Sequence, residues 1–374
     1  MTTTTPPPGD GLAAARRRDR RVYTRAHPVL FALLAATRRR PVVRLGDTVL
    51  VHGADAYRQV LTRLPLDRGA AGTTGGAARD LSGGRLLFDQ DGDDHRGARR
   101  AVADELGTAG VARLRPVWQD VLDRHLAPLH AGRSVDLVPL AGEVAGATVQ
   151  ALLDTPAAPA KIAHAAAQAA ASAVRDHLPG PRRPGTAREA AAAAACLEAL
   201  LAASGDTADA GLRSMLAVAA VSTTLAALPR AAAWCADARL WDQAADDTLR
   251  GALVGELLRV TAPSPLLPRV AAQDAVVDGC PVRGGDRLML VARHAARAHD
   301  MPPDARCPAA PGVAQLVFGA GPHACPGARL ARAQLEDTLA ALAPCRPAVV
   351  RARVDRRAAL PSWRSLIVRA VQEA

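Results

Sequence analysis

Cys325 is the residue of this sequence best placed to do chemistry. It lies in a loop punctuated by Gly319, Gly321 and Gly327, and an alanine- and leucine-rich helical pattern follows at once. Glycine permits backbone torsions and close approaches that residues with a Cβ resist. A thiolate at a helix start is stabilised by backbone N–H groups and by the helix dipole. The pattern therefore predicts an ionised metal ligand, and cysteine thiolate is one of the proximal ligands that haem iron takes.

Two charged pairs stand at helical spacing. Glu256 and Arg259 are three residues apart, and His95 and Arg99 are four apart. Each pair therefore shares one face of its predicted helix. A solvated surface ion pair would also explain Glu256 and Arg259. A capped helix start with a basic outer face would also explain His95 and Arg99.

The order Phe-x-x-Gly-x-His-x-Cys-x-Gly over 318–327 resembles the haem-binding loop of the cytochrome P-450 family of haem-thiolate monooxygenases. A buried cysteine near a helix end would explain Cys325 but none of its neighbours. The resemblance implies that Cys325 is the axial ligand of a haem b iron. It also implies the other cofactor-binding residues of this loop, which are Phe318, Gly319, His323 and Gly327.

The region around Glu256 and Arg259 is similar to the Glu-x-x-Arg element of the same family. There the pair is structural and locks to a third arginine, for which Arg306 is the best match. Arg269 matches the family arginine that binds a haem propionate. An always-charged, bidentate guanidinium is well suited to a carboxylate.

The stretch from an acidic turn into His95 and Arg99 resembles the His-x-x-x-Arg helix of the family. The resemblance implies that both side chains bind the haem propionates, with His323 as a third donor.

The long apolar helix expected over 211–236 departs from the family pattern. The family commonly has Ala-Gly-x-acid-Thr over the haem, where the acid and the threonine hydroxyl deliver protons to oxygen. The matching residues are Ala220 in place of glycine, Ser222 in place of the acid, and Thr223, which is kept. Serine cannot act as a carboxyl group at neutral pH, although it can hold a water molecule. The resemblance implies that these three residues are the catalytic ones, with proton delivery altered.

The elements that must position these residues are mostly helical. We expect a β-hairpin over 41–52 around Gly46 and Asp47, a loop over 68–84, and an interruption of the long helix at Pro229. The other helices are expected over 54–62, 94–153 with breaks, 157–174, 186–203, 246–260 and 326–342. The fold class is mainly α with a minor β region, which suits a P-450-like fold. We expect a disordered N-terminus over 1–20 and a single haem domain over 21–374.

Arginine supplies nearly all of the positive charge. The chain has 374 residues and a formal net charge of +11, yet Lys161 is its only lysine. High net charge is typical of nucleic-acid binding, but aromatic residues that could stack on bases make up only 2%. The alanine- and arginine-rich composition indicates the codon bias of a GC-rich, actinobacterial-like genome. We expect no nucleic-acid partner.

The six cysteines have no C-x-x-C spacing, so we expect neither a zinc site nor a disulfide framework but a reducing cytoplasm. The apolar run over 29–36 is far shorter than the roughly 20 residues that span a bilayer. No signal peptide or anchor is visible. We expect a cytoplasmic monomer without a membrane partner.

The resemblance implies an oxidoreductase of the monooxygenase type, acting on a small molecule in natural-product metabolism. Electrons would come from NAD(P)H through a separate ferredoxin or flavodoxin, for which Arg96, Arg100 and Arg329 offer a positive surface. The altered helix leaves oxidative coupling, peroxide-driven oxidation, or a haem-binding helper without turnover as alternatives. A helical DNA-binding regulator would leave 318–327 unexplained.

Overall fold

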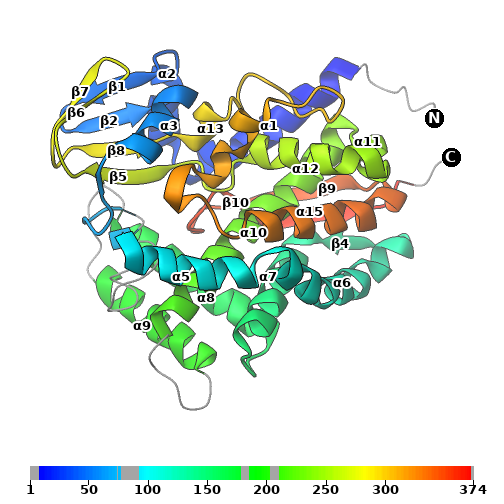
Figure 1. Cartoon of the computed structure of the whole chain (residues 1–374). Helices are drawn as coiled ribbons and strands as arrows, with labels where there is room; N and C mark the ends of the chain where they lie inside the picture. Colours follow the sequence, from blue (N-terminus) through cyan, green and yellow to red (C-terminus); the bar gives the residue numbers. More distant parts are fainter. Residues whose placement is uncertain (1–7, 74, 77–91, 178–184, 203–209, 372–374) are drawn as a thin grey trace.

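The computed structural model describes residues 8–73, 75–76, 92–177, 185–202 and 210–371 (Figure 1). Its longer helices are α1 (Pro8–Ala26), α2 (Pro28–Thr37), α3 (Ala54–Arg63), α5 (Gly92–Glu105), α6 (Thr108–His130), α7 (Leu137–Leu153), α8 (Pro159–His177), α9 (Thr186–Leu201), α10 (Ala210–Ala238), α12 (Asp247–Thr261) and α15 (Ala328–Leu342). Its short helical segments are α11 (Trp241–Ala245), α13 (Ala292–Ala295), α14 (Pro311–Ala314), η1 (Gln315–Phe318), η2 (Gly321–His323) and η3 (Ala343–Cys345). The prediction of a mainly α fold with minor β structure is confirmed.

The strands form three small sheets. The first has the order β1 (Val42–Leu45), β2 (Thr48–Val51), β8 (Arg287–Leu290), β5 (Leu267–Ala271), β3 (Leu66–Asp67). The second has the order β4 (Ser134–Asp136), β10 (Ser362–Arg369), β9 (Ala348–Asp355), and the third pairs β6 (Ala275–Val277) with β7 (Cys280–Val282). The predicted hairpin is confirmed, because Leu45 pairs with Thr48 across a turn in which Gly46 has φ +63°. That left-handed torsion is easy for glycine and strained for most other residues.

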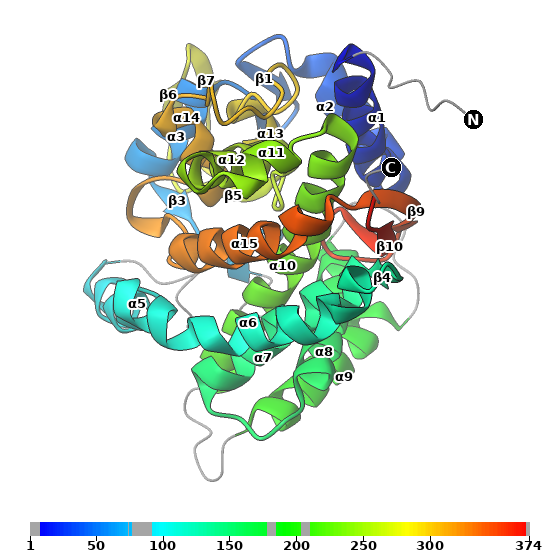
Figure 2. The same cartoon turned by 90° about the vertical axis from the view of Figure 1, so that its right-hand side faces the viewer.

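The α10 helix lies in the middle of the helical region, next to α7 and α8 on one side and α12 on the other (Figures 1 and 2). Its side chains Ala217, Val221 and Leu228 are buried in the core. Among the described residues it is the one helix long and apolar enough to cross a bilayer, but a core helix passes the same test. The predicted interruption at Pro229 is wrong, since the helix runs through that residue.

The prediction of a disordered N-terminus over 1–20 needs correction, because α1 begins at Pro8 and packs against α10. Ala15, Asp19, Val22 and Tyr23 form its buried stripe. Their spacing of three and four residues is the amphipathic helix signal, which the arginine-rich composition of the segment obscured.

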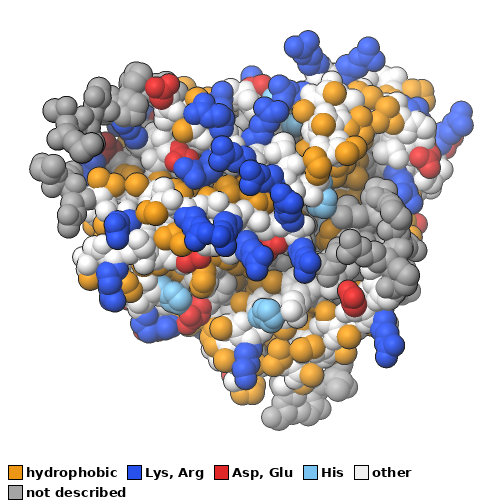
Figure 3. Space-filling view, turned by 180° about the vertical axis from the view of Figure 1, so that it is seen from behind, with side chains coloured by type: hydrophobic (Ala, Val, Ile, Leu, Met, Phe, Trp, Pro, Cys, Tyr) orange, Lys and Arg blue, Asp and Glu red, His pale blue; other side chains and the backbone are white. Residues whose placement is uncertain are grey.

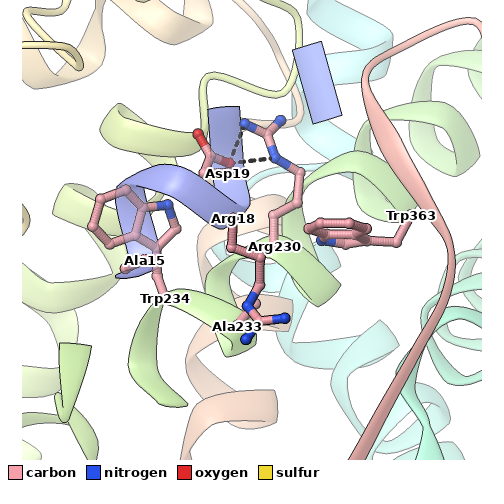
Figure 4. A pocket seen from close by; sticks show the side chains of 7 residues that line it. All are labelled: Ala15, Arg18, Asp19, Arg230, Ala233, Trp234 and Trp363. Atoms are coloured by element: carbon pink, nitrogen blue, oxygen red, sulfur yellow. Dashed lines mark hydrogen bonds and ion pairs between the residues drawn. The ribbon is translucent and has the colours of Figure 1, made fainter. Parts of the chain in front are cut away.

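A buried ion-pair network ties α1 to the centre of the molecule (Figure 4). Arg230 of α10 has a fully buried side chain, and its Nη2 lies 2.7 Å from Oδ1 of Asp19. Arg293 reaches the other carboxylate oxygen of Asp19 at 3.1 Å. Both arginines also donate to the hydroxyl of Tyr23, which donates to the carbonyl of Thr261 at 2.5 Å. These buried hydrogen bonds and ion pairs of Asp19 and Tyr23 fix the position of α1 against α10.

Two predicted loops fall largely outside the described residues. The segment 68–84 is described only as far as 73 and at 75–76, and the breaker cluster between α8 and α9 is described only at Gly185. The helices on either side of that cluster begin and end close to the predicted positions.

Candidate functional site

The loop that carries Cys325 has a defined backbone. The Cys325 N–H donates to the carbonyl of Phe318 at 2.7 Å, which closes the loop between η1 and α15. Gly319 and Gly321 have φ +79° and +70°. A Cβ on Gly321 would also come within 3.0 Å of the carbonyl oxygen of Leu61. Larger residues would therefore distort the loop at both positions, which accounts for the glycine spacing in the sequence.

The thiol of Cys325 sits in a mixed environment. Its side chain is accessible to solvent, yet neighbouring protein atoms desolvate it and raise its pKa. A hydrogen bond with the backbone of Gly327 and the charge of Arg99 act in the opposite direction and lower that pKa. Desolvation penalises the thiolate until a positive ion takes the place of the proton. This chemistry fits a residue that binds a metal as thiolate.

Gly327 stands directly beside the sulfur. A Cβ added there would lie 3.8 Å from Sγ of Cys325, which is ordinary contact. A small side chain would therefore fit there in ordinary contact with the sulfur. The α15 helix starts at the next residue, Ala328, so its first N–H groups lie near the thiolate.

Arg99 of α5 reaches this loop, a contact that the sequence did not predict; its expected contact with a haem propionate stays a prediction. Its Nη2 donates to the carbonyl of Ala324 at 2.6 Å, one residue before the cysteine. His95 belongs to the same helix, but its side chain lies outside the described residues. His323 is a half-buried member of η2. The predicted propionate contacts of these two histidines stay predictions.

Arg269 of β5 is half-buried in a positively charged setting. Burial and the charge of Arg68 lower its pKa to about 10, and Tyr57 partly offsets this. The Nη1 of Arg269 donates to the carbonyl of Pro268 at 2.8 Å. The guanidinium groups of Arg269 and Arg68 repel each other in a site that water reaches only in part. A bound anion such as a carboxylate would relieve this repulsion. The donor set therefore fits a haem propionate at Arg269, and Arg68 is a contributor that the generic loop sequence did not reveal.

Glu256 and Arg259 form the buried pair that the spacing predicted. The Nη2 of Arg259 donates to Oε2 of Glu256 at 2.5 Å, with side-chain exposures of 0% and 1%. A solvated surface pair is thereby excluded. The remaining N–H groups of Arg259 donate to four backbone carbonyls, which belong to Ala296, Arg297, Met301 and Pro302.

The prediction for Arg306 needs correction. Its side chain is exposed and makes no ion pair with Glu256 in the described part of the chain. The second acceptor oxygen of Glu256 instead takes the backbone N–H of Ala309 at 3.0 Å. A backbone donor that the fold brings in has no signature in the sequence, which is why an arginine was expected.

Arg332 of α15 also belongs to this region and was not predicted. Its guanidinium lies over the ring of Phe318, 5.3 Å from the centroid, and burial lowers its pKa. This contact braces η1 against α15 and so holds both ends of the cysteine loop.

The candidate catalytic residues lie on α10. The hydroxyl of Thr223 donates to the carbonyl of Ala219 at 2.7 Å, one turn earlier. The Oγ of Ser222 is buried and has no hydrogen-bond partner among the described residues. Ala220 packs against the core cluster that α7, α8, α9 and α10 share. A buried hydroxyl of this kind is suited to hold a water molecule.

The comparisons agree with this picture. Residues 241–342, which include Glu256, Arg259 and Cys325, match the family described as Cytochrome P450. A stretch of 106 residues is 40% identical to erythromycin C-12 hydroxylase of Saccharopolyspora erythraea. That stretch covers 27% of the chain and 26% of the relative, so the match spans about a quarter of each protein.

Solved structures extend the similarity to the whole fold. The structure of P450BioI, in complex with an acyl carrier protein ligated to hexadec-9Z-enoic acid, has a TM-score of 0.75 at 18% identity, covering 93% of this chain and 99% of the other. A mutant of P450 EryK, in complex with erythromycin B, has a TM-score of 0.71 at 22% identity, covering 94% and 99%. The family match thus covers the segment from Trp241 through the cysteine loop to Leu342, and the similarity of fold to solved P450 structures extends over nearly the full length of the chain.

Proposed function

We propose that the chain binds haem b through Cys325 and oxidises a small organic molecule. The observation that carries this proposal is the geometry of the Cys325 loop. The thiol is desolvated but accessible, and it is followed directly by a helix N-terminus. When bound, the haem iron supplies the splitting of O₂, with one oxygen atom inserted into a C–H bond and the other reduced to water by two electrons and two protons.

The protein residues around the cofactor would have separate tasks. Cys325 would provide the axial thiolate. Arg269 and Arg99 would bind propionate carboxylates, because Arg99 donates to the loop carbonyl of Ala324 and Arg269 is a half-buried cation beside Arg68. Glu256 and Arg259 would act on structure alone, since their hydrogen bonds hold the segments that lead to the loop.

The α10 residues would handle protons. The hydroxyl of Thr223 uses its hydrogen on the Ala219 carbonyl, which leaves its oxygen lone pairs free to accept from a water molecule. Ser222 Oγ would hold a second water in place of the missing carboxyl group. Ala220, which has a methyl group where glycine is usual, would narrow the space above the haem. Proton transfer would then run through ordered water rather than through an acid.

We place the substrate among natural products. The matched stretch of erythromycin C-12 hydroxylase and the fold of a P450 bound to erythromycin B both support a specialised metabolite. Electrons would come from a separate ferredoxin or flavodoxin. The alternatives are oxidative coupling, peroxide-driven oxidation, or a haem-binding helper protein without turnover. The serine at position 222, where the family pattern has an acidic residue, favours these alternatives.

The test is the spectrum of the reduced protein with carbon monoxide. Thiolate ligation gives a strongly red-shifted Soret band, and we expect Cys325→Ser to abolish it. Cys196→Ser, at another exposed cysteine, is the matched control and should leave the band in place. Retention of the band in Cys325→Ser would refute the ligand assignment. Turnover with a surrogate ferredoxin system, compared with turnover with peroxide, then separates the two functional candidates.

A further inference from the structure

The solvent face of α1 is almost entirely arginine. Its buried stripe leaves an outer arc that holds Arg16, Arg17, Arg20, Arg21 and Arg25, all of them exposed. The acidic residues of this helix are Asp10 at its start and the buried Asp19. In the described part of the chain none of the five makes an ion pair, although Arg16 donates to the backbone carbonyl of Asp300 at 3.0 Å.

The neighbouring sheet extends this positive surface. The α1 helix contacts β9, and Figure 3 shows arginine side chains gathered across that side of the molecule. The exposed arginines of β9, β10 and the turn between them are Arg351, Arg353, Arg356, Arg357, Arg364 and Arg369. None of these forms an ion pair with a described residue. We call these six, together with the five of α1, the arginine face.

What sets this surface apart is that eleven such arginines lie together. Some exposed arginines on other elements, such as Arg63 and Arg188, also form no ion pair with a described residue, whereas Arg44 pairs with Asp286 and Arg115 with Asp337. Within α1 itself, the partly buried Arg18 is paired with Asp237. Positive charge left unpaired over a continuous surface repels itself and is relieved by a polyanionic partner.

An apolar helix adjoins the arginine face. The α2 helix buries Leu34, but it exposes Val29 by 82% and Leu33 by 42% instead of carrying polar residues on its outer side. The exposed basic run Arg38, Arg39, Arg40 follows directly. Figure 3 shows hydrophobic side chains next to the arginines on this side.

Further exposed apolar residues lie in the same segments. Val350 of β9 is 62% exposed, and Val371, just after β10, is 53% exposed. Together with Val29 and Leu33 they are four of the six exposed large hydrophobic side chains in the described part of the chain. Apolar side chains among unpaired cations match the boundary between lipid headgroups and acyl chains.

We propose that α1, α2 and the β9–β10 sheet bind peripherally to the surface of an anionic phospholipid bilayer. The arginines would bind headgroup phosphates, and Val29 and Leu33 would enter the headgroup boundary. An acidic protein would neutralise the arginines but would not by itself require exposed valine and leucine on an adjoining helix. A surface contact also needs no spanning segment, so the short apolar run of α2 is sufficient for it.

The experiment is co-sedimentation of the nuclease-treated, full-length protein with two kinds of vesicle. We expect binding to equimolar phosphatidylglycerol and phosphatidylcholine, and little binding to phosphatidylcholine alone. At about 0.5 M NaCl, where the Debye length is only about 4 Å, most of the binding should be lost. Each arginine near an anionic surface adds about 1 kcal/mol, so losing two contacts in Arg17→Glu/Arg21→Glu should weaken binding roughly 30-fold or more.

Two further variants complete the test. Arg63→Glu/Arg188→Glu removes the same charge from exposed positions on α3 and α9, and it should bind nearly as the parent does. Val29→Ser/Leu33→Ser keeps every charge and should weaken binding several-fold. Equal binding to both vesicle types would overturn the proposal. So would an equal loss in the control charge variant, because binding would then follow net charge. If Arg17→Glu/Arg21→Glu left vesicle binding intact and instead raised the KM for the electron-donor protein, the surface would serve an acidic protein.

Discussion

Arg259 forms a buried, bidentate ion pair with Glu256. Its guanidinium binds both carboxylate oxygens of that residue, at 2.9 and 2.5 Å, and the carboxylate also accepts the backbone N–H of Ala309. The same guanidinium holds the backbone from Ala296 to Pro302. One ion pair on α12 thus fixes both segments that lead from α13 to the cysteine loop.

Removing the carboxylate should therefore disrupt the protein severely. Glu256→Ala leaves Arg259 buried and uncompensated, which costs roughly 3–5 kcal/mol of unfolding free energy. We expect mostly insoluble or haem-free protein, measured as the soluble yield and the haem content of that fraction. The control is Glu105→Ala, whose partner Arg113 is on the surface, with an expected loss of less than about 1 kcal/mol. Soluble, fully haem-loaded Glu256→Ala would show that the pair is dispensable.

The network around Asp19, which joins α1 to the C-terminal half of α10, should respond to mutation in a similar way. The single carboxylate of Asp19 pairs with both Arg230 and Arg293, and Trp234 and Trp363 flank the site (Figure 4). Asp19→Ala leaves a buried cation, with an expected loss of roughly 3–5 kcal/mol by chemical denaturation. Asp237→Ala is the matched control, because its partner Arg18 is partly exposed. Equal losses in the two variants would mean that burial of Arg230 is not what sets the cost.

Much of this arrangement was readable from the sequence. The glycine spacing around Cys325 predicted the loop, and the i, i+3 spacing of Glu256 and Arg259 predicted their pairing. Local patterns carry such information because neighbouring residues on a helix or turn fix each other's positions. The contacts of Arg259 with backbone carbonyls, and of Ala309 with Glu256, depend on tertiary folding and had no local pattern. The helix α1 was missed because its buried stripe has only four members among many arginines.

Stability should fall in mild acid because of a histidine cluster. Nδ1 of His52 lies 2.9 Å from Nδ1 of His294, and the His299 ring packs on His294. Burial lowers the pKa of His52 to about 4 and that of His294 to about 2, with the other histidines and Arg38 and Arg293 adding repulsion. Asp300, beside His299, is the one acid that acts in the opposite direction.

The direction of the effect follows from these shifts. In the unfolded chain each histidine has a pKa near 6.5, so protons bind the unfolded state first. The neutral, buried histidines therefore stabilise the folded state fully above about pH 6.5, and this stabilisation is lost as the pH falls toward 4. Between pH 7.5 and 4.5 we expect His52 alone to account for about 2–3 kcal/mol of lost unfolding free energy. Chemical denaturation at the two pH values measures it, with His52→Asn as the variant that should lose less. An equal loss in the variant would place the acid sensitivity elsewhere.

The altered α10 helix should make oxygen use inefficient. Ser222 offers a buried hydroxyl without a hydrogen-bond partner among the described residues, and Thr223 is the residue that we propose as the remaining relay group. With no carboxyl group, protons must pass through water held by these two hydroxyls. We expect uncoupled turnover of generic substrates, with hydrogen peroxide released for much of the NAD(P)H consumed. Ser222→Asp should raise product formed per NAD(P)H, and Thr223→Ala should lower it.

Thr224→Ala is the matched control for that series, because it removes a neighbouring hydroxyl from a different face of the same helix. The measurement is product and peroxide per NAD(P)H in the parent and the three variants, with haem content checked in each. The Thr223 hydroxyl donates its hydrogen to the carbonyl of Ala219 in the same helix. Removing this hydroxyl should therefore change the coupling of turnover more than the stability of the fold. Tight coupling in the parent, unchanged by Ser222→Asp and Thr223→Ala, would mean that protons reach the oxygen by another route and that these α10 residues do not form the relay.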